Sequence, residues 1–103
     1  MDVGVIGTGL MGTNHARAYA EMRQVDTLYL HDLDGTAAAR VAATTGGTVV
    51  HDLEEMIDRV DAVSLVVPTK YHQTYALRLA EAGVPMLIEK PICATVAEAM
   101  AGR

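Results

Sequence analysis

The chain has 103 residues, of which 50% are hydrophobic, and it carries a formal net charge of −5. This length suits one domain with one modest core, and the composition is not that of a disordered chain. The acidic balance argues against a nucleic-acid partner, because contacts to phosphates need clustered Lys and Arg side chains.

The composition also predicts where the protein works. No apolar run approaches the roughly 20 residues of a membrane-spanning helix, so no membrane partner is expected. The N-terminus lacks the residue order of a signal peptide. Cys93 is the single cysteine and cannot form an internal disulfide. Together these features predict a cytoplasmic protein. The spacing of the histidines and the lone cysteine predicts no metal site.

Short apolar runs alternate with longer helical stretches along the chain. The short runs predict five strands, at residues 3–6, 27–32, 48–50, 61–67 and 85–89. The longer stretches predict helices at residues 10–22, 35–44, 52–59 and 72–82, with a final helix beginning at 95. Asp52 with Glu55, and Thr95 with Glu98, have the spacing of capping boxes. This alternation predicts an α/β fold: a doubly wound parallel sheet of Rossmann type, with strand order 3-2-1-4-5.

The segment Gly7-Thr8-Gly9-Leu10-Met11-Gly12 is a G-x-G-x-x-G pattern between the first expected strand and the first helix. There the first glycine permits a tight turn, the second lets the backbone approach a diphosphate, and the third allows helix and strand to pack closely. All six residues are therefore candidates for cofactor binding. The alternatives are a plain turn with three glycines and, for Met11, a core side chain.

Asp32 ends the second expected strand, 20 residues after Gly12. A carboxylate in this position accepts hydrogen bonds from the hydroxyls of an adenosine ribose. No Lys or Arg lies between Asp32 and Ala39 to bind a 2′-phosphate, which the carboxylate would repel. The expected cofactor is therefore NAD, with NADP less favoured. The alternative for Asp32 is a helix cap, and capping is the favoured interpretation for Asp34.

Two further segments, Val66-Val67-Pro68-Thr69-Lys70-Tyr71-His72 and Glu89-Lys90-Pro91, lie at the ends of the fourth and fifth expected strands. With the glycine loop they resemble the glucose–fructose oxidoreductase/inositol dehydrogenase (Gfo/Idh/MocA) family, from residue 3 to about 100. The resemblance implies an NAD-dependent oxidoreductase that transfers hydride between the cofactor and a sugar-like alcohol or ketone. The segment Gly12-Thr13-Asn14-His15-Ala16-Arg17 is similar to that of members acting on nucleotide-sugars.

The resemblance also implies roles for individual residues. The segment Glu89-Lys90-Pro91 would border the nicotinamide, with Lys90 as the catalytic residue near the reacting carbon. Pro68 and Thr69 would lie along the cofactor crevice, and His72 would begin the next helix beside it. The alternatives are a solvated loop lysine for Lys90 and a polar surface residue for His72.

Other polar side chains have simpler interpretations. His15 is expected to be a packed or capping histidine. His31 is expected either to touch the adenosine or to lie at the surface at a strand end. Cys93 is interpreted as small apolar filler.

The family's sixth strand and its C-terminal α+β domain are not found within residues 1–103. We therefore expect the nucleotide-holding domain of a longer, homo-oligomeric enzyme, which by itself binds NAD weakly and turns over little substrate. Two alternatives remain. One is a non-catalytic NAD-binding regulatory module. The other is the N-terminal domain of a β-hydroxyacid-type dehydrogenase, which has a similar glycine loop but no Glu-Lys-Pro segment.

Overall fold

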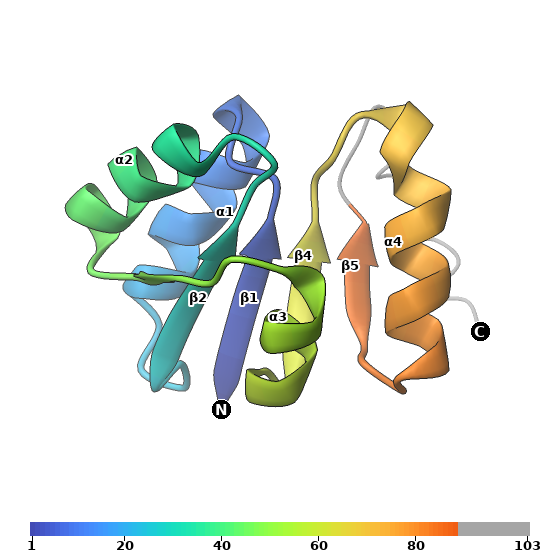
Figure 1. Ribbon diagram of the computed structural model, residues 1–103. Coiled ribbons are helices and arrows are strands. Elements are labelled where there is room, and N and C mark those ends of the chain that lie inside the picture. The colour runs from blue at the N-terminus through green and yellow to red at the C-terminus, as the bar shows by residue number, and fades with distance from the viewer. Residues whose placement is uncertain (89–103) are drawn as a thin grey trace.

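The computed structural model describes residues 1–88, which form a five-stranded parallel sheet with helices on both faces (Figure 1). The strands are β1 (Asp2–Ile6), β2 (Thr27–His31), β3 (Thr48–Val49), β4 (Ala62–Leu65) and β5 (Met86–Ile88). The helices are α1 (Leu10–Ala20), α2 (Gly35–Thr45), α3 (Leu53–Arg59) and α4 (Thr69–Glu81). The strand order β3-β2-β1-β4-β5 confirms the prediction. The helix expected from residue 95 lies outside the described residues, as does Cys93.

Each face of the sheet buries its own apolar cluster. The cluster between the sheet and helices α1 and α2 consists of Val3, Val5, Ala16, Leu28, Leu30 and Val41. The cluster between the sheet and helices α3 and α4 consists of Ile6, Val50, Met56, Val63, Leu65, Leu79 and Val84. A strand that is covered on both faces has to be apolar at successive positions, which explains the short continuous runs in the sequence.

The predicted caps begin two of the helices. The Asp34 side chain accepts hydrogen bonds from the amides of Thr36 and Ala37 at the start of α2, which confirms its capping role. The Asp52 side chain accepts from the Glu55 amide at the start of α3 (2.8 Å). In return, the Glu55 carboxylate accepts from the His51 amide (3.0 Å), one residue earlier than in the standard capping box.

Helix α4 begins at Thr69, three residues before the predicted start at residue 72. Its N-cap is Pro68, whose φ of −53° is already suited to lead into a helix. The next three residues, Thr69 to Tyr71, lack the apolar periodicity on which the prediction depended. The helix was therefore predicted too short at its N-terminal end.

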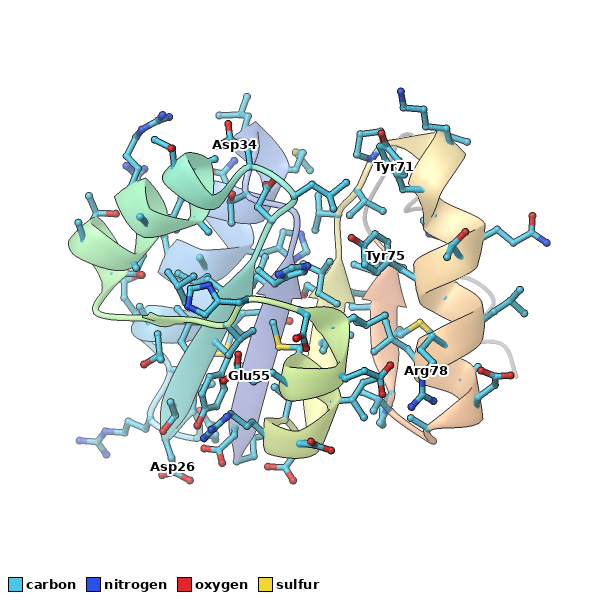
Figure 2. All side chains as sticks on the ribbon, in the orientation of Figure 1. Asp26, Asp34, Glu55, Tyr71, Tyr75 and Arg78 are labelled. Atoms are coloured by element: carbon cyan, nitrogen blue, oxygen red, sulfur yellow. The ribbon has the colours of Figure 1, made fainter. Side chains whose placement is uncertain are left out.

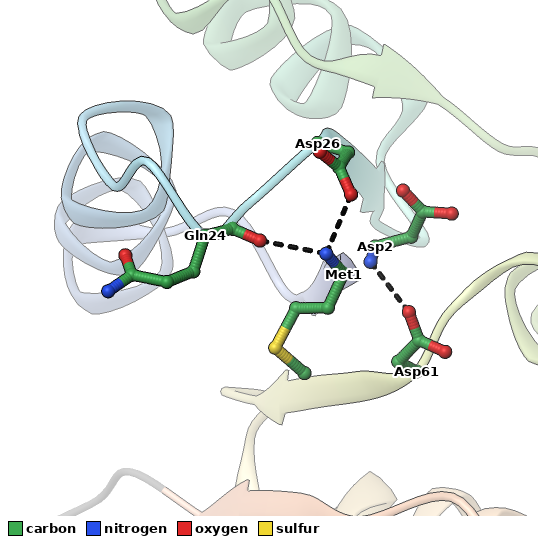
Figure 3. Close-up of polar contacts among 5 residues, drawn as sticks. All are labelled: Met1, Asp2, Gln24, Asp26 and Asp61. Atoms are coloured by element: carbon green, nitrogen blue, oxygen red, sulfur yellow. Dashed lines mark hydrogen bonds and ion pairs between the residues drawn. The ribbon is translucent and has the colours of Figure 1, made fainter.

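The first residues of the chain are fixed to the segment before β2 and to the residue before β4 (Figure 3). The Met1 ammonium donates to the Gln24 carbonyl oxygen (2.8 Å) and to Asp26 Oδ2 (2.7 Å). The hydrogen bond to Asp26 raises the pKa of this ammonium. The Asp2 amide donates to Asp61 Oδ2 (2.7 Å). These contacts hold β1 between its two neighbours at the amino end of the sheet, opposite the glycine loop.

Candidate functional site

A cleft of about 660 Å³ opens at the carboxyl ends of β1, β2 and β4. It lies where the strand order reverses between β1 and β4, which is where open parallel sheets bind their ligands. The loops after these three strands and one side of α4 form its walls. The lining residues are Ile6, Gly7, Thr8, Gly9, Leu10, Met11, Gly12, Asp32, Leu33, Asp34, Val66, Val67, Pro68, Thr69, Tyr71 and Tyr75.

Two glycines of the G-x-G-x-x-G segment, Gly7 in the loop after β1 and Gly12 in α1, are required by the chain's own backbone. Gly7 has a φ of +97°, and a Cβ on it would collide with the Val66 carbonyl oxygen. A Cβ on Gly12 would collide with the Gly7 carbonyl oxygen. The first and third glycines of the pattern therefore allow β1, α1 and the end of β4 to approach each other closely.

Gly9 differs from both. Its φ of −71° suits any residue. Apart from its chain neighbours, no atom of residues 1–88 lies within 4 Å of the position that a Cβ would take. Gly9 nevertheless lines the cleft. Nothing in the described chain requires glycine here, so the missing side chain keeps space open for something that enters the cleft.

The N-terminus of α1 faces the same space. Its N-cap is Gly9, no side chain caps it, and its first turn contains no acidic residue. The amide groups of a first helical turn have no partner within the helix, and they carry the positive end of its dipole. An anion in the cleft would therefore be stabilised by backbone N–H groups that no carboxylate of the helix competes for.

Asp32 connects the loop after β2 to the glycine loop. Its Oδ2 accepts hydrogen bonds from the Thr8 amide and the Thr8 hydroxyl, both at 2.7 Å, and its Oδ1 accepts from the Asp34 amide at 2.8 Å. Burial opposes the charge of this carboxylate, but the hydrogen bonds from Asp34 and Thr8 outweigh burial and lower its pKa. Asp32 is therefore ionised at neutral pH. The cap of α2 is Asp34, so the capping interpretation of Asp32 is wrong.

The structure gathers nine of the predicted cofactor-binding residues around this one cleft: Gly7, Thr8, Gly9, Leu10, Met11, Gly12, Asp32, Pro68 and Thr69. His72 does not line the cleft, and it lies at the fourth position of α4 and not at its start. Glu89, Lys90 and Pro91 lie outside the described residues. Met11 is 43% exposed, so its interpretation as a core side chain is wrong.

Two histidines have structural roles. The His31 side chain is buried, its Nδ1 lies 3.1 Å from the Val50 carbonyl oxygen, and it does not line the cleft. Both interpretations of His31, as an adenosine contact and as a surface residue, are therefore wrong. His15 packs against β4, with its Nδ1 2.9 Å from Ser64 Oγ, as expected of a packed histidine.

Helix α4 also contributes two tyrosines to the cleft that were not predicted from the sequence. Tyr71 and Tyr75 lie on the side of this helix that faces the middle of the molecule, and both line the cleft (Figure 2). Burial raises the pKa of Tyr75, and the negative charge of Asp32 raises it further, so its hydroxyl stays neutral. The four-residue spacing of the two tyrosines places them on one helical face, which is the signal that could have found them.

The described part of the chain contains no helix with the length and hydropathy of a transmembrane span. Within residues 1–88, no three His, Cys, Asp or Glu side chains are grouped so that they could hold a metal ion.

This sheet topology, with a glycine turn and a strand-end carboxylate on one cleft, defines a dinucleotide-binding domain of the Rossmann type. The chain belongs to the GFO_IDH_MocA family, described as an oxidoreductase family with an NAD-binding Rossmann fold, whose family model matches residues 1–101. This match confirms the family resemblance and identifies the chain as a nicotinamide-cofactor-binding domain.

The relatives are considerably longer proteins. The UDP-N-acetylglucosamine 3-dehydrogenase of Acidithiobacillus ferrooxidans is 39% identical, over 96% of this chain and 31% of its own length. The inositol 2-dehydrogenase 2 of Saccharopolyspora erythraea is 40% identical, over 92% and 29%. The crystal structure of GenD2 from gentamicin A biosynthesis in complex with NAD has a TM-score of 0.81 and 31% identity, over 89% and 27%.

The chain therefore spans about a third of the length of the curated relatives it matches. None of these matches supports the β-hydroxyacid dehydrogenase alternative or the non-catalytic module.

Proposed function

We propose that the chain is the cofactor-holding part of an NAD-dependent dehydrogenase that oxidises or reduces a sugar-like or nucleotide-sugar alcohol or ketone. The names of the relatives support the substrate class, since they act on UDP-N-acetylglucosamine and inositol. The proposal of a bound dinucleotide rests on Gly9. The described part of the chain would tolerate a side chain at this position, yet a glycine lines the cleft here beside the start of α1.

The residues of the cleft fit a dinucleotide. Gly9 and the first turn of α1 would bind the diphosphate, and Asp32 would accept a hydrogen bond from the adenosine ribose. When bound, the nicotinamide supplies hydride chemistry. In this proposal, Pro68 and Thr69 lie along the cofactor, and the segment Glu89-Lys90-Pro91 borders the nicotinamide. Lys90 then positions the substrate hydroxyl and takes or returns its proton.

The relatives are about three times as long as this chain, so we propose that substrate binding and turnover need further residues. The complete enzyme is proposed to be cytoplasmic and homo-oligomeric.

Replacing Gly9 by alanine is expected to weaken NAD binding at least tenfold while lowering the thermal midpoint of unfolding only slightly, since alanine is a poorer N-cap than glycine. The backbone of Gly9 suits alanine, and the added Cβ meets no atom of residues 1–88 beyond its chain neighbours. That Cβ would hold a diphosphate away from the α1 amides, and a hydrogen bond weakens steeply with distance. Calorimetric titration of NAD and a thermal melt measure the two effects.

Gly35→Ala is the matched control, because its Cβ also meets none of the described residues beyond its chain neighbours and Gly35 does not line the cleft. It should leave NAD affinity unchanged. If Gly9→Ala binds NAD as tightly as the wild type, the glycine loop does not hold the diphosphate. If the wild type itself binds no NAD, the proposed function is wrong.

The proposed preference for NAD over NADP depends on Asp32. The wild type is expected to bind NAD at least tenfold more tightly than NADP, because the ionised carboxylate repels a 2′-phosphate. In Asp32→Ala the ratio of the two affinities should fall close to one. Asp52→Ala changes the net charge equally but lies outside the cleft, so it should keep the wild-type ratio. A wild type that prefers NADP contradicts this part of the proposal.

A further inference from the structure

Thr8 occupies the first variable position of the glycine loop, which the G-x-G-x-x-G pattern leaves unspecified. Its side chain is only 6% exposed, so water does not compete for its hydroxyl. Both of its donors, the backbone amide and the hydroxyl, lie 2.7 Å from the same atom, Asp32 Oδ2. One residue thus contributes two hydrogen bonds to one carboxylate oxygen of the candidate site.

These contacts limit the number of further hydrogen bonds that the Asp32 carboxylate can accept. A carboxylate accepts about four hydrogen bonds, two on each oxygen. Oδ2 already accepts two from Thr8, and Oδ1 accepts one from the Asp34 amide. With respect to the described residues, the acceptor position that remains is on Oδ1, and Asp32 lines the cleft. The side chain is held at both oxygens, so it presents that position in one orientation.

We propose that Thr8 is a positioning residue that determines cofactor specificity, by holding the Asp32 carboxylate so that Oδ1 accepts a ribose hydroxyl and opposes a 2′-phosphate. This inference rests on the proposed function, because it assumes that the cleft binds a nicotinamide dinucleotide. Thr8 acts through Asp32 and does not itself need to touch the ligand.

The surroundings of Asp32 are consistent with this role. His31 precedes it and adds a favourable electrostatic interaction, while Tyr75 faces it from α4 as a neutral hydroxyl. The loop around Thr8 is also fixed, since the Gly7 amide donates to the His31 carbonyl oxygen (2.8 Å) and the Thr13 hydroxyl donates to the Thr8 carbonyl oxygen (3.3 Å). Removing the Thr8 hydroxyl therefore changes the support of Asp32 without freeing the loop.

The test compares Thr8→Val, which removes the hydroxyl at nearly constant shape, with Thr8→Ser, which keeps it. In Thr8→Val the ratio of NAD to NADP affinity should fall about tenfold, as expected for the loss of one hydrogen bond to a charged group. Thr8→Ser should stay within about twofold of the wild type. Thr13→Val removes a hydroxyl of α1 that supports the loop through the Thr8 carbonyl oxygen but does not contact Asp32. Because both Thr8 donors remain, this variant should also leave the ratio unchanged.

A second measurement needs no nucleotide. The Asp32 side-chain carboxyl carbon, followed by NMR over pH, should titrate at a higher pH in Thr8→Val than in the wild type, with Thr8→Ser restoring the wild-type value. A role for Thr8 in packing alone would not move this titration. If Thr8→Val does not fold, Thr8→Ala removes the same hydroxyl and replaces it in both measurements.

The outcomes separate the two proposals. If the wild type prefers NAD but Thr8→Val keeps the wild-type affinity ratio, the Thr8 inference is overturned and the proposed function stands. An unshifted Asp32 titration in Thr8→Val also overturns the inference. If the wild type binds neither nucleotide, the proposed function and the specificity role of Thr8 fall together.

Discussion

Replacing Gly7 by alanine is expected to lower the free energy of unfolding by about 3 kcal/mol, which combines a strained backbone with an overpacked contact. The φ of +97° is one that alanine rarely adopts, and the new Cβ would collide with the Val66 carbonyl oxygen. Neither atom can move aside easily, because the Cβ is bonded directly to the backbone after β1 and the oxygen belongs to the backbone after β4. For a small domain this loss is a large fraction of the total stability.

Gly46→Ala separates the two contributions. Gly46 has a comparable φ of +77°, but a Cβ on it meets no atom within 4 Å. Only the backbone strain remains, and we expect a loss of about 1 kcal/mol. Urea denaturation followed by circular dichroism measures both variants. Equal losses at the two positions would show that the contact with Val66 does not contribute.

The fold could be predicted from the sequence because local and global signals agree. The central strand β1 is a short run of mainly β-branched residues, and helices α2 and α3 begin at the caps Asp34 and Asp52. With right-handed crossovers, five such strands permit few topologies. The errors lie at element ends, as at the start of α4, because an apolar pattern does not show where backbone hydrogen bonding begins.

The candidate site was predictable only where a backbone rule requires a residue type. The glycines and Asp32 follow from the geometry of a turn and a strand end. By contrast, the contact between Thr8 and Asp32 joins residues 24 positions apart and depends on one side-chain orientation. The burial of His31 could not be predicted either, because it depends on Val50 and Tyr75, which are distant in the sequence. Such pairings exist only after the sheet has assembled.

The packing of α3 on the sheet depends on a further glycine, Gly4 in the middle of β1. A Cβ on Gly4 would collide with Met56 Sδ and lie 3.1 Å from Val60 Cγ1. Met56 is fully buried, so its side chain occupies the space that the absent Cβ leaves. Close packing of this kind makes the two positions energetically dependent on each other.

Met56→Ala is therefore expected to lower the free energy of unfolding by about 3 kcal/mol in the wild type, because it leaves a cavity in the core. Gly4→Ala alone should lower it by about 2 kcal/mol through overpacking. In the double variant the new Cβ at position 4 enters the space that Met56 leaves. The combined loss should fall short of the sum by about 1 kcal/mol.

Leu79→Ala provides the control for this cycle, since Leu79 is also fully buried in the same cluster but is not among the atoms nearest to the Gly4 Cβ. Its loss should add to that of Gly4→Ala within about 0.5 kcal/mol. Denaturant unfolding of the wild type, the three single variants and the two double variants gives both coupling energies. A Met56 coupling no larger than the Leu79 coupling would mean that α3 can shift to accommodate a side chain at position 4. The position of α3 would then depend on the whole cluster and not on the fit between Gly4 and Met56.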